Sequence, residues 1–247
     1  MKTLGCILRL NNRWVALKAA RTTKTSAFIA LQSVSMDATT PFPASTFRRQ
    51  DETPDAEFYR QPRFVTHIDP GAVAAVTQLY REYFAPDSSL LDLMSSWISH
   101  LPAEMRFSRV VGLGMNKAEL AVNPQLNAHV VQDLNQQPTL PFADHEFDGA
   151  AICVSIDYLT QPVAVLRELA RVLRPGAPLV ITFSNRCFPS KAIAAWHALD
   201  SRGHLALVRQ YLVAAGGWHA VELLDRSPQP PGRSDPLFAV VARPITQ

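Results

Sequence analysis

The sequence has few cysteines, and their spacing limits the chemistry available to it. Only 3 occur in 247 residues, at positions 6, 153 and 187, and none has the short spacing of a metal-binding cluster, so no metal site is predicted. Cys153 and Cys187 fall in or beside predicted core segments, which indicates buried, reduced thiols. No apolar run approaches the roughly 20 residues that a membrane-spanning helix needs, so no membrane span is predicted either.

Acidic residues are absent from the first 36 positions, although the whole chain has 21 of them. The same stretch contains the basic residues Lys2, Arg9, Arg13, Lys18, Arg21 and Lys24. The rest of the chain therefore carries 18 basic and 21 acidic side chains, and the formal net charge of +3 comes from the N-terminal stretch. A mildly acidic folded part argues against a nucleic-acid-binding domain, in which a basic patch is expected.

The composition of residues 1–36, basic, free of acid and rich in Ser and Thr, is typical of an organellar transit peptide and predicts a mitochondrial or plastid location. Two other interpretations fit the same residues, an unstructured tail or a translation start at Met36, and the protein would then be cytoplasmic. Residues 37–68 are polar and broken by prolines, which predicts a linker or a strap. We expect one domain at 69–247.

The third quarter of the chain contains a strand, a helix and a second strand. Residues 147–155 and 178–184 include short apolar runs with almost no charge, and residues 161–174 have apolar side chains at three- and four-residue steps. Pro175 and Gly176 break the helix before the second strand. This order of elements, with both strands apolar, predicts a parallel sheet that helices cover on both faces.

The residues of this unit resemble one protein family. Phe147-Asp148, Leu166-Arg-Glu-Leu-Ala-Arg-Val-Leu-Arg-Pro-Gly176 and Leu179-Val-Ile-Thr-Phe-Ser-Asn185 are similar to the second half of the class I S-adenosylmethionine-dependent methyltransferases, of the type 11 kind. The resemblance extends over about residues 70–243. It implies an α/β fold with a doubly wound, Rossmann-like, seven-stranded and mostly parallel sheet that ends in an antiparallel hairpin.

The chain departs from the family after its first predicted strand, residues 89–94, which a predicted helix over 69–86 precedes. In the family a glycine-rich loop follows this strand and lets the backbone approach the cofactor. The acidic residue near the end of the strand, Asp92, is kept, but the three glycines are replaced by Met94, Ser96 and Ile98. We expect residues 95–100 to form a turn into a short helix, with the serine hydroxyls replacing the missing contacts.

Two further strand ends carry the rest of the predicted cofactor site. In the family an acidic residue at the tip of the second strand binds the ribose hydroxyls; its place falls at Gly114, and Asn116 can still hydrogen-bond a hydroxyl. The resemblance also implies that Asp133 accepts from the adenine amino group, although capping of a turn is the alternative. The predicted cofactor-binding residues are Asp92, Met94, Ser95, Ser96, Gly114, Met115, Asn116, Asp133, Leu134 and Ser155.

The loop after the fourth predicted strand faces the transferred methyl group in the family. Asp157 and Tyr158 in this loop are candidates for a catalytic base or an orienting group, and capping of the next helix is the alternative. No nucleophile-elbow or catalytic-cysteine pattern surrounds Ser96, His100 or Cys187. The chain also lacks the Gly-x-Gly-x-x-Gly that a nicotinamide-dependent reductase needs after its first strand.

Two functions remain. The first is a methyltransferase with S-adenosylmethionine as cofactor and a small-molecule substrate, whose pocket would come from residues 1–84 and the region after Ser184. The second is a methyltransferase-fold protein that has lost catalysis and serves in binding or assembly with a protein partner. Fold alone does not decide between them.

Overall fold

A computed structural model of the chain describes residues 7–10, 13–16 and 42–245. The chain divides into two compact units, Met1–Pro43 and Ala44–Gln247. In the first unit, β1 (Ile7–Leu10) pairs antiparallel with β2 (Arg13–Ala16). The rest of the predicted transit peptide or tail lies outside the described residues, so this part of the sequence analysis stays a prediction.

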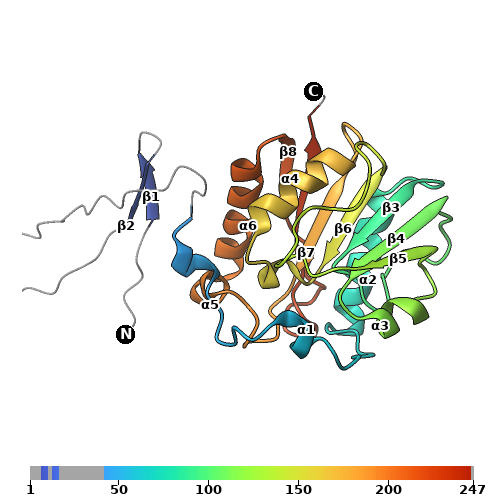
Figure 1. Ribbon diagram of the computed structural model, residues 1–247, viewed down its shortest axis with the longest axis horizontal. Helices are drawn as coiled ribbons and strands as arrows, with labels where there is room; N and C mark the ends of the chain where they lie inside the picture. The colour runs from blue at the N-terminus through green and yellow to red at the C-terminus, as the bar shows by residue number, and fades with distance from the viewer. Residues whose placement is uncertain (1–6, 11–12, 17–41, 246–247) are drawn as a thin grey trace, which may run out of the picture. The chain divides into compact units, whose positions relative to one another are not determined.

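The second unit contains a seven-stranded sheet in the order β5-β4-β3-β6-β7-β9-β8 (Figure 1). Its parallel strands are β3 (Ser89–Leu93), β4 (Arg109–Gly114), β5 (Ala128–Val131), β6 (Gly149–Cys153) and β7 (Leu179–Phe183). Antiparallel pairing joins β9 (Phe238–Pro244) to β7 and to β8 (Trp218–Asp225). The predicted fold class, a mostly parallel α/β sheet with an antiparallel C-terminal hairpin, is confirmed.

The helices connect these strands and cover the sheet. They are α2 (Pro70–Tyr83), α3 (Lys117–Val122), α4 (Pro162–Val172), α5 (Ala194–Ala198) and α6 (Ser201–Ala215). Asp69 caps α2, and its side chain accepts a hydrogen bond from the Ala72 amide. Buried side chains of α2 form one core cluster with Leu90, Ala151 and Val180 of the sheet. Because successive strand residues face opposite sides, the neighbours of these three residues face the side of α4 and α6 (Figure 1).

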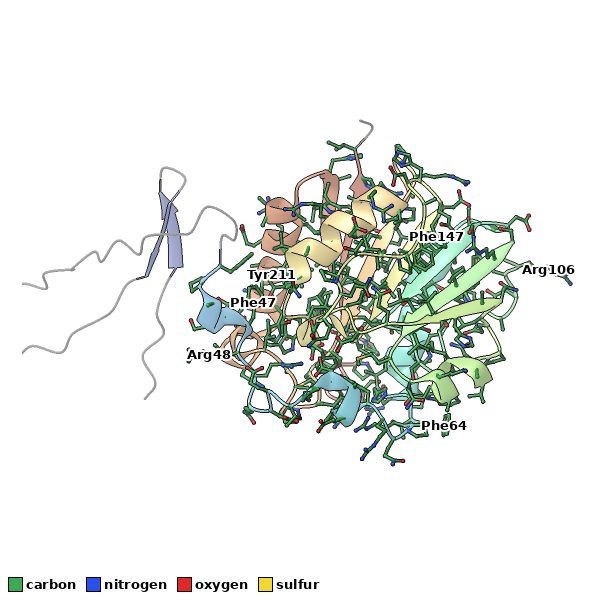
Figure 2. The ribbon with its side chains drawn as sticks, viewed as in Figure 1. Phe47, Arg48, Phe64, Arg106, Phe147 and Tyr211 are labelled. Carbon is green, nitrogen blue, oxygen red and sulfur yellow. The ribbon has the colours of Figure 1, made fainter. Side chains whose placement is uncertain are left out.

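Residues 44–68, called the strap below, belong to the same compact unit as the sheet. The strap contains the 3-10 helix η1 (Ala44–Phe47) and the short helix α1 (Asp55–Phe58). The Phe47 ring lies 6.0 Å from the Tyr211 ring of α6, centroid to centroid (Figure 2). Farther along, the carbonyl of Arg48 accepts from the Ala194 amide and the Asp51 amide donates to Ser190. The strap therefore runs along the domain with specific backbone contacts.

The short helix expected after residues 95–100 is not there, and this prediction is wrong. Residues 94–108 connect β3 to β4 without any helix. The hydroxyls of Ser95 and Ser99 both donate to the Asp92 side chain, and such local bonds compete with a helical ladder. Pro102 follows, and a proline disfavours the helical conformation in the residue before it. The free amide groups of a helix start are therefore missing behind this loop.

Candidate functional site

A cavity of about 300 Å³ lies at the carboxyl ends of β3, β4 and β6. The chain order of the strands reverses between β3 and β6, and open α/β sheets bind ligands at such a switch point. The volume is at the lower end of the range for small-molecule pockets. The strap completes the wall with residues that include Asp55, Tyr59 and His67.

The cavity brings together most of the residues that the sequence singles out. Its lining includes Asp92, Met94, Ser95, Ser96, Gly114, Met115, Asp133, Leu134, Ser155 and Tyr158. Asn116 and Asp157 do not line it. The contact of each lining residue with a cofactor stays a prediction, but their common location gives it a physical basis.

Asp92 is a buried acidic group on the cavity wall, with 6% of its surface exposed. Its Oδ2 accepts hydrogen bonds from the hydroxyls of Ser95 and Ser99, both at 2.6 Å. Burial raises the pKa of the Asp92 carboxyl to about 6, and the two hydroxyls act in the opposite direction. The group is thus mainly ionised at neutral pH and takes up a proton under mildly acidic conditions.

The loop after β3 packs closely on β4 and uses glycines there. The Ser95 amide donates to the Leu113 carbonyl at 2.9 Å. A Cβ atom on Gly114 would lie 2.1 Å from the Ser95 carbonyl oxygen, so no larger residue fits. Met94, at the place of the family's first glycine, keeps a positive φ of 58°. In the family, loop glycines let the loop backbone approach the cofactor closely. Here the close approach is between the loop backbone at Ser95 and Gly114 of β4.

The same loop also holds the strap. The Ser96 hydroxyl donates to Glu119 Oε2 of α3, and the Arg63 amide of the strap donates to Glu119 Oε1, both at 2.6 Å. Trp97 Nε1 donates to the Val65 carbonyl at 2.9 Å, and the Trp97 ring meets Phe64 edge to face. Figure 2 shows Phe64 at the outer surface, in the region of α3. The serine hydroxyls expected to replace glycine contacts thus donate to carboxylates of the protein, which leaves their lone pairs for a ligand.

Asn116 has its side-chain amide fully engaged. Its Oδ1 accepts from the amides of Ala118 and Glu119 and so caps α3. Its Nδ2 donates to the carbonyls of Tyr59 and Arg60 in the strap. This side chain holds the start of α3 and the strap in place. Both bonds of its Nδ2 go to strap carbonyls, and its role towards the ribose remains a prediction.

Asp133 caps a turn, which is one of the two roles that the sequence analysis leaves open. Its Oδ1 accepts from the amides of Asn135 and Gln136, which is the capping of a turn. The residue also lines the cavity, beside the buried Leu134. The turn orients the carboxylate, and its role towards adenine remains a prediction.

Two histidines on the cavity wall were missed as binding residues in the sequence analysis. Burial lowers the pKa of His67, and it lowers the pKa of His100 to about 4, so both rings are neutral at pH 7. The buried Nδ1 of His100 and the buried hydroxyl of Ser155 have no partner among the described residues. Unpartnered polar atoms on the wall fit a polar ligand. No local pattern around either histidine indicates this location.

Comparison with known proteins bears directly on this geometry. Residues 95–181 match the family model described as a methyltransferase domain. This match supports a class I methyltransferase family for that segment of the chain. The match implies S-adenosylmethionine as the cofactor, and the cavity wall has the polar groups of Asp92 and Asp133 beside the apolar side chain of Leu134. The matched residues begin at Ser95, in the loop after β3, and end within β7.

Curated relatives match only part of the chain. An O-methyltransferase of Aspergillus sclerotiorum is 30% identical over 100 residues, which are 37% of this chain and 38% of the relative. An O-methyltransferase of Pyrenophora dematioidea is 43% identical over 63 residues, 24% of each chain. A demethylmenaquinone methyltransferase of a Mycobacterium species is 45% identical over 53 residues, 20% of this chain and 23% of the relative. The chain thus spans well under half the length of these relatives.

Solved structures share the fold at low sequence identity. A chain from the complex between the Haloferax volcanii Trm112 methyltransferase activator and a methyltransferase has a TM-score of 0.56 at 15% identity, covering 71% of this chain and 90% of that one. The [4+2]-cyclase SpnF has a TM-score of 0.53 at 17% identity, covering 70% and 80%. The cyclase illustrates that this fold hosts more than one reaction. In the part of the chain that the structure describes, no helix is long and apolar enough to cross a membrane.

Proposed function

We propose that the protein is an S-adenosylmethionine-dependent methyltransferase that acts on a small molecule. The observation that carries the proposal is that one cavity, at the switch point of the sheet, is lined by every predicted cofactor-binding residue except Asn116. A methyltransferase domain at residues 95–181 supports the same reaction class. The size of the cavity supports a small-molecule substrate and does not indicate which one.

In the proposed site, each of three strand ends contacts a different part of the cofactor. Asp133 and Leu134 after β5 would hold the adenine. The Gly114–Met115 segment at the end of β4 would lie at the ribose, and Asp92 with Ser95 at the end of β3 would face the methionine part. When bound, the cofactor supplies a methyl group on a positively charged sulfur. The chain's own residues position it, and the strap excludes water from the reacting end of the cavity.

The second candidate function, a binding or assembly protein without catalysis, is favoured by one observation. The loop after β3 lacks the family's glycines, and no helix start lies behind it. Both features reduce the number of backbone amides available to the cofactor. The two candidates therefore differ in whether the cavity binds the cofactor at all.

Calorimetric titration of the full chain with S-adenosylmethionine and S-adenosylhomocysteine separates them. We expect a dissociation constant of about 1–100 μM for S-adenosylhomocysteine, equal to roughly −8 to −5.5 kcal/mol. Asp133→Ala should weaken binding about tenfold, the effect of one lost hydrogen bond of ~1.4 kcal/mol. The matched control is Asp144→Ala, which changes an exposed carboxylate outside the cavity.

Unchanged affinity in Asp133→Ala would remove this residue from the site. No heat and no thermal shift at millimolar ligand would sink the methyltransferase proposal and leave the binding module as the better account, because a ligand that binds the folded state must raise its stability.

A further inference from the structure

The cavity extends beyond the proposed cofactor half, towards the ends of β6 and β7. The residues there are Tyr59, His67, Tyr158, Arg186, Cys187 and Phe188. Three of the six are Tyr or Phe, and the ring centroids of Tyr158 and Phe188 lie 5.9 Å apart. This half of the cavity thus offers aromatic surface to a second ligand. The following inference concerns that ligand and rests on the proposed function.

Arg186 is the only Lys or Arg that lines the cavity among the described residues. Its Nε donates to Asp235 Oδ1 at 2.9 Å, and the guanidinium makes no other hydrogen bond or ion pair within the described part of the chain. Asp235 has a side chain only 10% exposed. One edge of the guanidinium is therefore fixed by a buried carboxylate, while its terminal N–H groups remain available.

The support behind Arg186 is itself rigid. The Asp69 amide donates to Asp235 Oδ2 at 3.0 Å, and the Asp235 amide donates back to Asp69 Oδ2 at 2.7 Å. Asp69 also caps α2, so this reciprocal pair connects the helix before β3 to the segment before β9. Such a built support lowers the entropy lost when the guanidinium binds a ligand.

Competing acids in the cavity already have partners. Asp55 pairs with Arg49 at 2.7 Å and with Lys191 at 3.2 Å, and Asp92 holds two serine hydroxyls. A guanidinium presents N–H donors in a planar fork that matches a carboxylate. We propose that Arg186 binds the carboxylate of the methyl acceptor, a small anionic molecule whose apolar or aromatic body lies against Tyr158 and Phe188.

The test uses phenylacetate and its neutral analogue phenylacetamide as probes, titrated into the full chain with and without saturating S-adenosylhomocysteine. Phenylacetate should bind at least about fivefold more tightly than phenylacetamide. Arg186→Gln should abolish this preference and leave the affinity for S-adenosylhomocysteine within about twofold of the unaltered chain. Arg209→Gln, the same charge change at an exposed position of α6, should keep the preference.

Equal binding of the two probes, a preference that survives Arg186→Gln, or no binding of phenylacetate at 20 mM would each overturn the inference. Failure of the proposed function is seen separately, because it appears as a loss of S-adenosylhomocysteine binding in the unaltered chain, whereas the titration without that ligand still measures the preference for the carboxylate.

Discussion

At the scale of single residues, Asp157 shows how burial can change the role that a residue is expected to have from its place in the sequence. Its place after the fourth predicted strand makes it a candidate base. The structure buries it to 3% exposure, outside the cavity lining, and leaves its Oδ2 without a partner among the described residues. Burial raises the pKa of this carboxyl to about 8. A buried aspartic acid without a partner lowers the stability of the folded state at pH values at which it must ionise.

This pKa predicts a dependence of stability on pH. An unfolded aspartic acid has a pKa of about 4, so between about pH 4 and pH 8 the folded state keeps a proton that the unfolded chain has released. Stability therefore falls as pH rises through this window, by up to ~1.4 kcal/mol per pH unit from this group. Asp157→Asn removes that component, and we expect its melting temperature to exceed that of the unaltered chain by more at pH 8 than at pH 5.

Thermal unfolding at a series of pH values checks this prediction. Asp144→Asn, at an exposed carboxylate, should give a curve parallel to that of the unaltered chain. The contribution of Asp92, whose pKa is also raised, cancels because both proteins contain it. Parallel curves for Asp157→Asn as well would show that this carboxyl is ionised in the folded state.

At the scale of elements, the sequence predicts what is local. Apolar runs place β3, β6 and β7, the resemblance to the family implies the other strands of the sheet, and the predicted helix over 69–86 matches α2. The helix expected after residues 95–100 fails because serine hydroxyls bond Asp92 instead of leaving the backbone to form a ladder. No local sequence pattern predicts the contacts of the strap, because they join distant positions such as Arg63 and Glu119, which are 56 residues apart.

The contact between loop and strap predicts a local opening in Trp97→Ala. This change removes the bond to the Val65 carbonyl and the edge-to-face contact with Phe64. The Arg63 amide, which donates to Glu119, should then exchange its hydrogen about tenfold faster, as expected for ~1.4 kcal/mol of lost local stability. Trp97→Phe keeps a ring and loses the N–H donor, so its effect should be smaller.

Hydrogen exchange measured residue by residue contains its own control. The Asp51 amide donates to Ser190 at the other end of the strap and should exchange at an unchanged rate in Trp97→Ala. Because the strap walls the cavity, S-adenosylhomocysteine should also bind more weakly to this variant. An Arg63 amide that exchanges as slowly as before would mean that Trp97 does not hold the strap.

At the scale of the whole molecule, the strap decides where the folded unit begins. Lys191 is fully buried, and its partners all come from the strap. Its Nζ lies 2.6 Å from the Thr53 carbonyl, 3.2 Å from Asp55 Oδ1 and 3.4 Å from Asp51 Oδ2. The sequence analysis expects the domain at 69–247, where this lysine would have none of these partners. A buried ammonium without a counter-charge costs roughly 3–5 kcal/mol.

Two truncated proteins therefore differ sharply. Residues 44–247 should keep the melting temperature of the full chain within about 2 °C, because this segment forms a compact unit. Residues 69–247 should lose roughly 3–5 kcal/mol of unfolding free energy, enough to bring a domain of ordinary stability close to unfolding. Urea titration followed by circular dichroism measures both.

Lys191→Met tells whether the buried charge, rather than lost apolar contact, causes that difference. In residues 69–247 the substitution should change stability little, because the strap residues that pair with the ammonium and cover it are absent. In residues 44–247 it should lower stability, because Asp55 would keep only Arg49 as its cationic partner. A loss of stability in residues 44–247 alone identifies the strap as part of the folding unit. An equal loss in both proteins would assign the effect to packing alone.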